Sequence, residues 1–262
     1  MASSSFASKY GPWAVVAGAS EGLGAAFAAA LAARGVHLLL LARRAELLER
    51  VAQDLRATAK IEIRTEVCDL ARPDLPAALE AMTAGLEVGL AVYNAACAPI
   101  GEFAARPLDD LLRVVDVNVR GPLVFARVLA PAMIARGCGG LVLMSSLAGL
   151  QGASRIAAYA ASKSFNTILG EGLWRELRPH GVDVVVACAG GIRTPAYAAA
   201  ASREALGTLD ADVIAEATLG ALGRGPIVVP GAVNKFARFV LTRMLSRRAA
   251  IATFARSTED LL

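Results

Sequence analysis

The sequence predicts one α/β domain in which helices cover both faces of a parallel sheet. Short apolar runs that suit buried strands alternate with longer helical patterns, which is typical of such a sheet. The 262 residues can bury an ample core, and no internal repeat or linker divides them. A glycine-rich turn between the first strand and the first helix fits the same architecture.

Seven strands are expected at Trp13–Ala17, His37–Leu41, Ile61–Val67, Leu90–Asn94, Leu141–Ser145, Val182–Cys188 and Ile227–Val229. Six helices are expected between them, at Leu23–Arg34, Ala45–Ala59, Leu75–Ala84, Asp109–Arg136, Ala158–Arg178 and Asp212–Leu222. Right-handed crossovers then predict the strand order 3-2-1-4-5-6-7, counted along the chain. Pro122 is expected to bend the fourth helix, because proline removes a backbone donor.

Composition excludes several classes of protein. The net charge of +4 is too small and too dispersed for a nucleic-acid-binding surface. No apolar run reaches the ~18–20 residues of a membrane-spanning helix, and the first residues do not resemble a signal peptide. The four cysteines form no C-x-x-C pair, and two histidines could hardly complete a metal site, so no metal is expected. Free thiols in a reducing cytoplasm are the expectation.

The glycine-rich turn is Ala17-Gly18-Ala19-Ser20-Glu21-Gly22-Leu23-Gly24. It follows an apolar strand and opens a helix, so unpaired backbone N–H groups and the helix dipole would point at an anion. Glycines let the backbone approach that anion closely. The turn therefore predicts a site for the diphosphate of a dinucleotide.

Ser146, Tyr159 and Lys163 are spaced as Ser-x12-Tyr-x3-Lys. Tyr159 and Lys163 would share one face of a helix. A nearby ammonium favours the phenolate, which moves a proton normally held until a pH of roughly 10 toward an exchangeable range. A serine hydroxyl from a strand end could hold a carbonyl oxygen while the tyrosine protonates it. Such a pair is common by chance, and the distant glycine turn gives it weight.

The second strand is followed by two arginines, in Leu41-Ala42-Arg43-Arg44. An NAD enzyme would place an acid near this point to bind both ribose hydroxyls. Guanidinium groups instead match a phosphate, and Ser20 could add a hydroxyl donor. The pattern predicts NADP(H) as the cofactor; the alternative is that the arginines are a solvated pair.

Together these motifs resemble the short-chain dehydrogenase/reductase family over almost the whole chain. The resemblance implies a Rossmann fold and a catalytic tetrad of Asn118, Ser146, Tyr159 and Lys163, in which Asn118 holds a proton-relaying water and Lys163 also holds the nicotinamide ribose. With the motifs above, it implies a cofactor site of Gly18, Ser20, Glu21, Gly22, Leu23, Gly24, Arg43, Arg44, Asp69, Leu70, Asn94, Ala95, Ala96, Tyr159, Lys163, Gly190, Ile192 and Thr194. Many NADP-using relatives carry a base where this chain has Glu21, so Glu21 is expected to point away or to pair with an arginine.

The chain departs from the family pattern at three places. Ala17 replaces the usual threonine, Tyr93-Asn94-Ala95-Ala96 replaces Asn-Asn-Ala-Gly, and Ala189-Gly190 replaces Pro-Gly. The main question these raise is whether Ala96 must adopt a backbone conformation that favours glycine.

Within the single domain 1–262, the dinucleotide-binding half is expected at about 11–150 and the catalytic and substrate-binding half at about 140–262. The resemblance implies a substrate lid near 192–210, and a plain surface helix is the alternative. A basic amphipathic segment near 235–256 is expected to pack on the protein, with a membrane surface as the second possibility. The alanine-rich faces of the two longest predicted helices, and the family's habit, predict a homodimer or homotetramer.

The predicted activity is reversible hydride transfer between NADP(H) and a ketone or secondary alcohol. The sequence resembles the branch that includes 7β-hydroxysteroid dehydrogenases and the group of 17β-hydroxysteroid and long-chain 3-oxoacyl reductases. A bulky apolar ketone such as a hydroxysteroid is the first choice of substrate, and a 3-oxoacyl thioester is the second. A non-catalytic NADP-binding sensor or scaffold is a third hypothesis, against which the intact Ser–Tyr–Lys set argues. A methyltransferase of similar fold is disfavoured by Arg43, which stands where a ribose-binding acid is expected.

Overall fold

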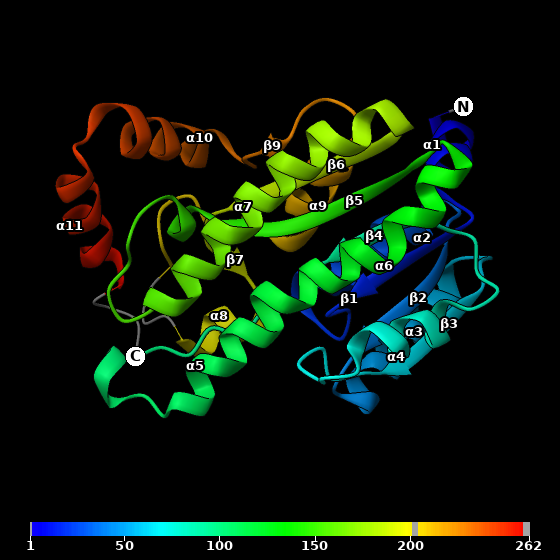
Figure 1. The fold of residues 1–262 in the computed structure, drawn as a ribbon, viewed down its shortest axis with the longest axis horizontal. Helices are drawn as coiled ribbons and strands as arrows, with labels where there is room; N and C mark the ends of the chain where they lie inside the picture. The colour runs from blue at the N-terminus through cyan, green and yellow to red at the C-terminus, as the bar shows by residue number, and fades with distance from the viewer. Residues whose placement is uncertain (1, 201–203, 259–262) are drawn as a thin grey trace.

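A computed structural model describes residues 2–200 and 204–258, and its centre is a seven-stranded parallel sheet (Figure 1). The strands are β1 (Trp13–Ala17), β2 (His37–Ala42), β3 (Ile63–Val67), β4 (Val88–Tyr93), β5 (Gly139–Ser146), β6 (Val182–Ala189) and β9 (Ile227–Val228). Their order is β3-β2-β1-β4-β5-β6-β9, and every neighbouring pair is parallel. The predicted strand order is confirmed, because β9 is the seventh strand of this sheet.

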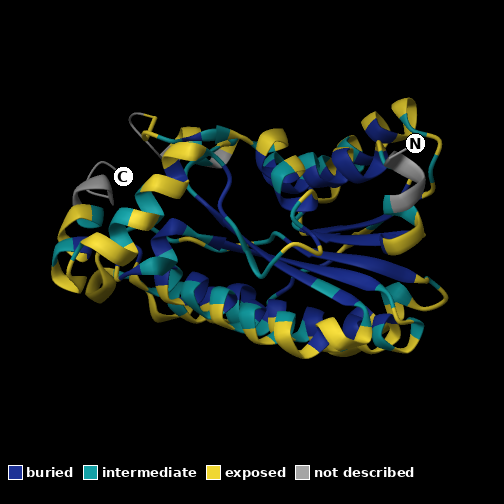
Figure 2. Cartoon of the chain, turned by 90° about the horizontal axis from the view of Figure 1, so that it is seen from above, coloured by how far each residue is buried: buried dark blue, intermediate teal, exposed yellow. Residues whose placement is uncertain are grey.

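Helices cover both faces of the sheet (Figure 2). Alternate residues of β1 belong to different cores: Ala14 and Val16 face one, and Trp13, Val15 and Ala17 face the other. The first core is closed by α2 (Gly22–Ala32), α3 (Ala45–Thr58) and α9 (Ala211–Leu219), and the second by α4 (Leu75–Thr83), α6 (Gly121–Arg136) and α7 (Ala157–Leu177). Burial on both faces explains why the central strands are continuously apolar rather than alternating.

The fourth predicted helix is continuous over 108–136 but not uniform. It consists of α5 (Leu108–Val115), a π-helical turn (Asp116–Arg120) and α6. The irregularity therefore precedes Pro122, contrary to the expected bend there, and Pro122 occupies the first turn of α6, where a missing N–H costs little.

Among the described residues, this helix is long and apolar enough to cross a membrane by length and composition, and half of its most apolar window is buried inside the domain. It packs against α4, β4 and β5, as the core helix of a folded domain does.

Several elements lie outside the sequence-based prediction. An N-terminal helix, α1 (Ala2–Tyr10), packs beneath β4 and β5, where the Tyr10 hydroxyl donates a 2.6 Å hydrogen bond to Asp183 on β6. The predicted lid contains a two-stranded ribbon of β7 (Ile192–Arg193) and β8 (Leu209–Asp210) and the short helix α8 (Pro195–Ala200). Its residues 201–203 lie outside the described part of the chain.

The basic segment near 235–256 forms α10 (Ala232–Phe239), a π-helical turn (Val240–Met244) and α11 (Arg247–Thr258). These helices stand beyond the carboxyl edge of the sheet, beside the start of α7 (Figure 1). Arg247 fastens them to the loop after β5 by donating to the carbonyl of Leu150. Packing on the protein, the favoured expectation, is therefore found for part of the segment.

Candidate active site

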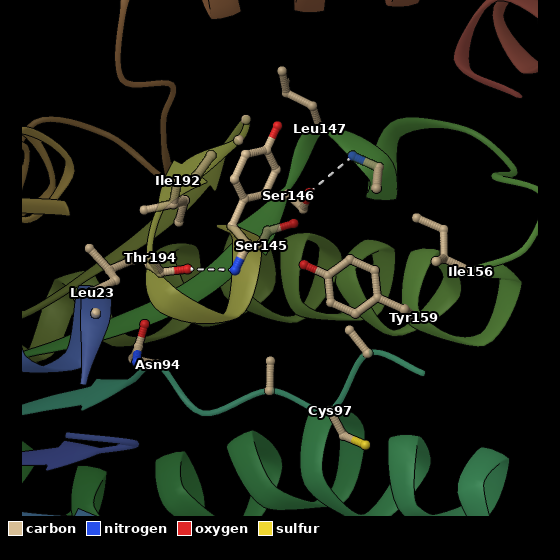
Figure 3. Close-up of a pocket in the computed structure, with 18 of the residues that line it drawn as sticks. Leu23, Asn94, Cys97, Ser145, Ser146, Leu147, Ile156, Tyr159, Ile192 and Thr194 are labelled. Carbon is tan, nitrogen blue, oxygen red and sulfur yellow. Dashed lines mark hydrogen bonds between the residues drawn. The ribbon is translucent and has the colours of Figure 1, made fainter. Parts of the chain in front are cut away.

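A cavity of about 1000 Å³ opens at the carboxyl edge of the sheet, where the chain direction switches between β1 and β4. All of the predicted catalytic and cofactor-binding residues line this cavity except three. Gly24, Asn118 and Lys163 lie behind its wall, each in contact with a residue that does line it. The two sequence motifs are therefore brought together in one site (Figure 3).

The glycine turn is compact because neighbouring chain segments press against it. Gly18 has φ +82°, and a Cβ there would stand 2.8 Å from the backbone of Ala95. Gly22 has φ +54°, and its missing side chain leaves room for Thr194, which follows β7. A Cβ on Gly24 would overlap the carbonyl oxygen of Gly18, so this glycine lets α2 start close to the turn. The first N–H groups of α2 consequently face the cavity edge without intrahelical partners.

An arginine from the end of β2 is held across the glycine turn. Arg44 forms a 2.6 Å ion pair with Glu21 and donates a 3.1 Å hydrogen bond to the Ser20 hydroxyl. Of the two expectations for Glu21, pairing with an arginine is the one found. Arg43 is exposed and also lines the cavity. The cavity edge thus carries two guanidinium groups and a hydroxyl within reach of one another.

Asp69, at the end of β3, pairs with an arginine that the sequence did not single out. Both carboxylate oxygens accept hydrogen bonds from Arg113 on α5, at 2.9 and 2.8 Å, and one also accepts from the N–H of Ala71. Burial tends to raise the pKa of Asp69, but these hydrogen bonds and the charges of Arg113 and Arg43 lower it overall. Asp69 is therefore an ionised acceptor at neutral pH.

Asn118 ties the loop after β4 to α7. Its amide oxygen accepts from the N–H of Cys97 at 2.7 Å, and its amide nitrogen donates to the Cys97 carbonyl at 2.8 Å and to the Ser162 hydroxyl at 3.0 Å. The side chain is fully buried and its hydrogen bonds are satisfied. Asn118 thus fixes one wall of the cavity relative to the helix that carries Tyr159 and Lys163.

Tyr93 supports the π-helical turn on which Asn118 lies. Its buried hydroxyl donates a 2.6 Å hydrogen bond to the Val117 carbonyl, and its ring packs edge-on against Phe125. This reach requires Gly121, since a Cβ there would stand only 2.0 Å from the Tyr93 oxygen. The tyrosine at this departure from the family pattern therefore satisfies a carbonyl of the widened turn.

Ser146 and Tyr159 face each other across the cavity. Tyr159 projects from α7 with its hydroxyl directed toward the end of β5, where Ser146 lies (Figure 3). The two side chains share a hydrogen bond, and the Ser146 oxygen also accepts from the N–H of Ala148 at 3.2 Å. Ser145 anchors the same strand end to α7, because its hydroxyl donates to the Lys163 carbonyl at 2.8 Å. Two hydroxyls are thus held side by side, where a carbonyl oxygen could accept from both.

Lys163 is almost completely buried, and its ammonium donates a 3.0 Å hydrogen bond to the Met144 carbonyl. Burial lowers the pKa of Lys163 to about 8. Burial raises the pKa of Tyr159, and the hydrogen bond with Ser146 only partly opposes this. The expectation that Lys163 lowers the Tyr159 pKa is therefore not met by the protein alone, in which the ammonium lies 5.5 Å from the ring centroid. Tyr159 is protonated at neutral pH.

The other end of the cavity is apolar. Leu147 and Ile156 lie next to the two hydroxyls (Figure 3), and Leu241, Leu245 and Phe254 of the C-terminal helices close the far side. This wall offers a substrate a large hydrocarbon surface beside two hydrogen-bond donors.

A family model described as short chain dehydrogenase matches residues 12–205, which is most of the chain. The chain belongs to the short-chain dehydrogenase family. A very-long-chain 3-oxoacyl-CoA reductase of Podospora anserina is 35% identical over 186 residues, covering 67% of this chain and 53% of that protein. The chain thus spans about half the length of the curated relatives it matches.

Solved structures cover the chain more fully. A structure described under 7β-hydroxysteroid dehydrogenase stereoselectivity has 25% identity and a TM-score of 0.89, and the match covers 95% of this chain and 98% of that one. A short-chain dehydrogenase from Sphingobium yanoikuyae in complex with NADPH has 26% identity and a TM-score of 0.77, with 90% and 97% covered.

The departures from the usual short-chain dehydrogenase pattern are accommodated without strain. Ala96 does not adopt the left-handed conformation, since Arg155 is the only described non-glycine residue with positive φ. The carbonyl of Ala17 accepts from the N–H groups of Asn94 and Ala95, so β1 and β4 stay joined at the site. All four cysteines are free, and no cluster of metal-ligating side chains occurs in the described part of the chain.

Sequence reasoning missed four residues of this short-chain dehydrogenase site. Arg113 and Cys97 line the cavity, Phe254 closes it from α11, and Asn166 donates to the same Met144 carbonyl as Lys163, at 3.3 Å. Asn166 follows Lys163 by three residues, so helical spacing could have placed it on the same face. No local signal pointed to the other three, whose positions depend on contacts between distant segments.

Proposed function

We propose that this chain is an NADP(H)-dependent oxidoreductase that interconverts a bulky apolar ketone, such as a hydroxysteroid, and the secondary alcohol. The observation that carries the proposal is the pair of hydroxyls on Ser146 and Tyr159, which stand between the glycine turn and an apolar wall in one cavity. Family membership supports the reaction class, and the likeness to the 7β-hydroxysteroid dehydrogenase structure along nearly the full length supports the substrate class.

The residues present fit a dinucleotide phosphate. The close approaches at Gly18 and Gly22 leave a cradle that side chains would fill, and the start of α2 points N–H groups at it. Arg43, Arg44 and Ser20 would hold a 2′-phosphate, and Asp69 the adenine side. When bound, the nicotinamide supplies or accepts the hydride. The NADPH complex of a similar short-chain dehydrogenase supports this choice of cofactor.

Proton transfer falls to Tyr159 in this proposal. During reduction, Ser146 and Tyr159 both donate hydrogen bonds to the carbonyl oxygen, and the Tyr159 proton moves to that oxygen as the alcohol forms. Tyr159 holds its proton at neutral pH because burial raises its pKa, so it is ready to act as the acid. Lys163, with a pKa of about 8, is largely charged at neutral pH and stabilises the phenolate that remains.

Lys163 would also hold the nicotinamide ribose, and Asn118 would hold the water that returns a proton through Lys163, as the family resemblance implies. The side-chain amide of Asn118 is already used by Cys97 and Ser162, so its backbone carbonyl is the group left for that water. Pro122, four residues later, has no N–H with which to occupy this carbonyl in the α-helical manner.

A 3-oxoacyl thioester is the second candidate substrate. The specific observation in its favour is the similarity to curated very-long-chain 3-oxoacyl-CoA reductases, at 35% identity for the protein of Podospora anserina. The apolar wall would receive an acyl chain as readily as a steroid ring system.

The test is oxidation of NADPH against a panel of hydroxysteroid ketones, 3-oxoacyl thioesters and small aromatic ketones, repeated with NADH. The proposal predicts the highest kcat/KM for a steroid ketone with NADPH. Faster turnover of the acyl thioesters would transfer the assignment to the second candidate. Tight NADPH binding with no turnover of any ketone would contradict catalysis and favour a sensor or scaffold.

Two further proposals concern the setting of the enzyme. Four free thiols suit a reducing cytoplasm. Self-association into a homodimer or homotetramer is supported by an exposed apolar stripe along α5 and α6, formed by Leu108, Leu112, Val115 and Leu123. Ile168 on α7 is 65% exposed as well, so both of the long helices present apolar surface to a possible second copy.

A further inference from the structure

An exposed apolar patch lies on the outer face of α10 and the π-helical turn that follows it. Phe236 is 68% exposed, Met244 67% and Phe239 54%. Val233 is 44% exposed and touches the 204–208 segment, in which Leu206 is 90% exposed. Large side chains at this helical spacing with so much accessible surface form a face, whereas single exposed apolar residues are common and need no explanation.

The patch lies in the most cationic stretch of the chain. Residues 217–258 contain seven Lys and Arg residues and no Asp or Glu, whereas in the rest of the chain 23 acids outnumber 20 cations. Lys235, Arg243 and Arg248 are exposed beside the apolar side chains. The local charge is thus opposite to that of the rest of the protein, and a helical face that combines aromatic residues with cations matches an anionic lipid surface.

The patch borders the mouth of the active-site cavity. Leu206, Val233 and Phe236 line the cavity and are exposed outside it. Phe239 and Met244 do not line the cavity, although they continue the same outer face. A surface that seats this patch would therefore also face the entrance of the cavity.

We propose that α10, the π-helical turn and the beginning of α11 dock this protein on the surface of an anionic lipid bilayer. Phe236, Phe239 and Met244 enter the acyl boundary, and Lys235, Arg243 and Arg248 contact lipid phosphates. A second copy of the chain is a poorer occupant, because a two-fold contact through this face would place the same cations opposite one another. Docking turns the cavity mouth toward the bilayer, from which an apolar substrate could enter; this last step alone rests on the proposed function.

Vesicle co-flotation tests the docking directly and requires no activity. We expect the protein to float with vesicles of phosphatidylcholine mixed with phosphatidylglycerol, not with phosphatidylcholine alone, and to be released as salt is raised. Phe239→Ser combined with Met244→Ser should abolish binding. Lys235→Glu combined with Arg243→Glu should weaken it at least about 25-fold, since each cation near an anionic surface contributes roughly fivefold.

Two control variants are matched to these changes. Phe103→Ser removes an aromatic side chain that is 63% exposed on another face, and Arg50→Glu with Lys60→Glu makes the same change in net charge on and just after α3. Both should retain vesicle binding. Thermal unfolding and turnover of a water-soluble ketone should be unchanged in the Phe239/Met244 variant, because neither residue lines the cavity.

The proposal is overturned if the unmodified protein ignores anionic vesicles, or if the patch variants and the controls bind equally well. Light scattering in which the Phe239/Met244 variant loses a dimer that the unmodified protein forms, without vesicle binding, would show instead that the face joins two copies of this chain. Loss of ketone turnover with intact vesicle binding would count against the proposed function and leave the docking in place.

Discussion

Cofactor choice depends on two arginines in unequal situations. Arg44 is already engaged, by a 2.6 Å ion pair with Glu21 and a hydrogen bond to Ser20, whereas Arg43 is exposed at the cavity edge. The Arg44 and Glu21 side chains are 52% and 35% exposed, so their pair is worth only ~0.2–1 kcal/mol. A charge-assisted contact with a 2′-phosphate is worth ~1.5–3 kcal/mol. Arg44 should therefore leave Glu21 for the phosphate at a small net cost.

Three substitutions follow from this comparison. Arg43→Ala should lower kcat/KM for NADPH roughly ten- to a hundredfold, through the loss of one such contact, and change that for NADH little. Glu21→Gln should improve NADPH by about 1.4- to 5-fold, because Arg44 no longer has to leave an ion pair. Adding Ala42→Asp to Arg43→Ala should shift preference toward NADH, since the carboxylate would accept from the ribose hydroxyls and repel a phosphate.

The assay is a comparison of kcat/KM for NADPH and NADH with one ketone, using Arg50→Ala on the outer face of α3 as the control. The reasoning would be refuted if the unmodified enzyme preferred NADH. It would fail equally if Glu21→Gln weakened NADPH, because that result would make the carboxylate part of the cofactor site.

Three other predictions concern stability and assembly. Tyr10→Phe should lower the free energy of unfolding by ~1.5–3 kcal/mol in denaturant titrations, because it removes a hydrogen bond to the Asp183 carboxylate and keeps the ring; the Lys9–Asp183 pair is partly exposed, and a Lys9→Ala effect as large as this would contradict the assignment. Burial lowers the pKa of Lys163 to about 8, so between pH 8 and the ordinary value of 10.5 the unfolded chain binds a proton that the native chain does not. Stability should therefore rise with pH in this window, by up to ~1.4 kcal/mol per unit from this group, and a Lys163→Met variant with the same slope would refute the cause. Light scattering at micromolar concentration should show a dimer or tetramer that Leu112→Glu weakens, and a 27.0 kDa particle for the unmodified protein would contradict self-association.

Features set by local chemistry could be predicted from the sequence. The central strands are buried on both faces, so each is a continuous apolar run, and their order followed from the handedness of the crossovers. The glycine turn and the Ser–Tyr–Lys spacing were readable because each places several groups within one turn or one helix face. Seven-strand order and the convergence of both motifs on one cavity were therefore accessible before the structure.

Contacts between distant segments were not readable in this way. The pairing of Arg113 with Asp69 joins residues 44 positions apart, and the Tyr93 hydrogen bond that supports the π-helical turn requires a glycine at position 121. The first helix carries a serine run with little helical patterning, and its anchor is a single tyrosine that reaches Asp183. The ammonium of Lys163 meets a strand carbonyl in the protein alone, which spacing along one helix could not reveal.

Comparison of the unmodified enzyme with Tyr159→Phe tests the central claim most directly, by NADPH oxidation with the best ketone and by NADPH binding measured separately. The substitution removes the proton donor and keeps the ring, so turnover should fall at least ~10²-fold, the lower range for general acid catalysis, while the Kd for NADPH stays near normal. A variant that retains half of the activity would place the proton donor elsewhere and contradict the account.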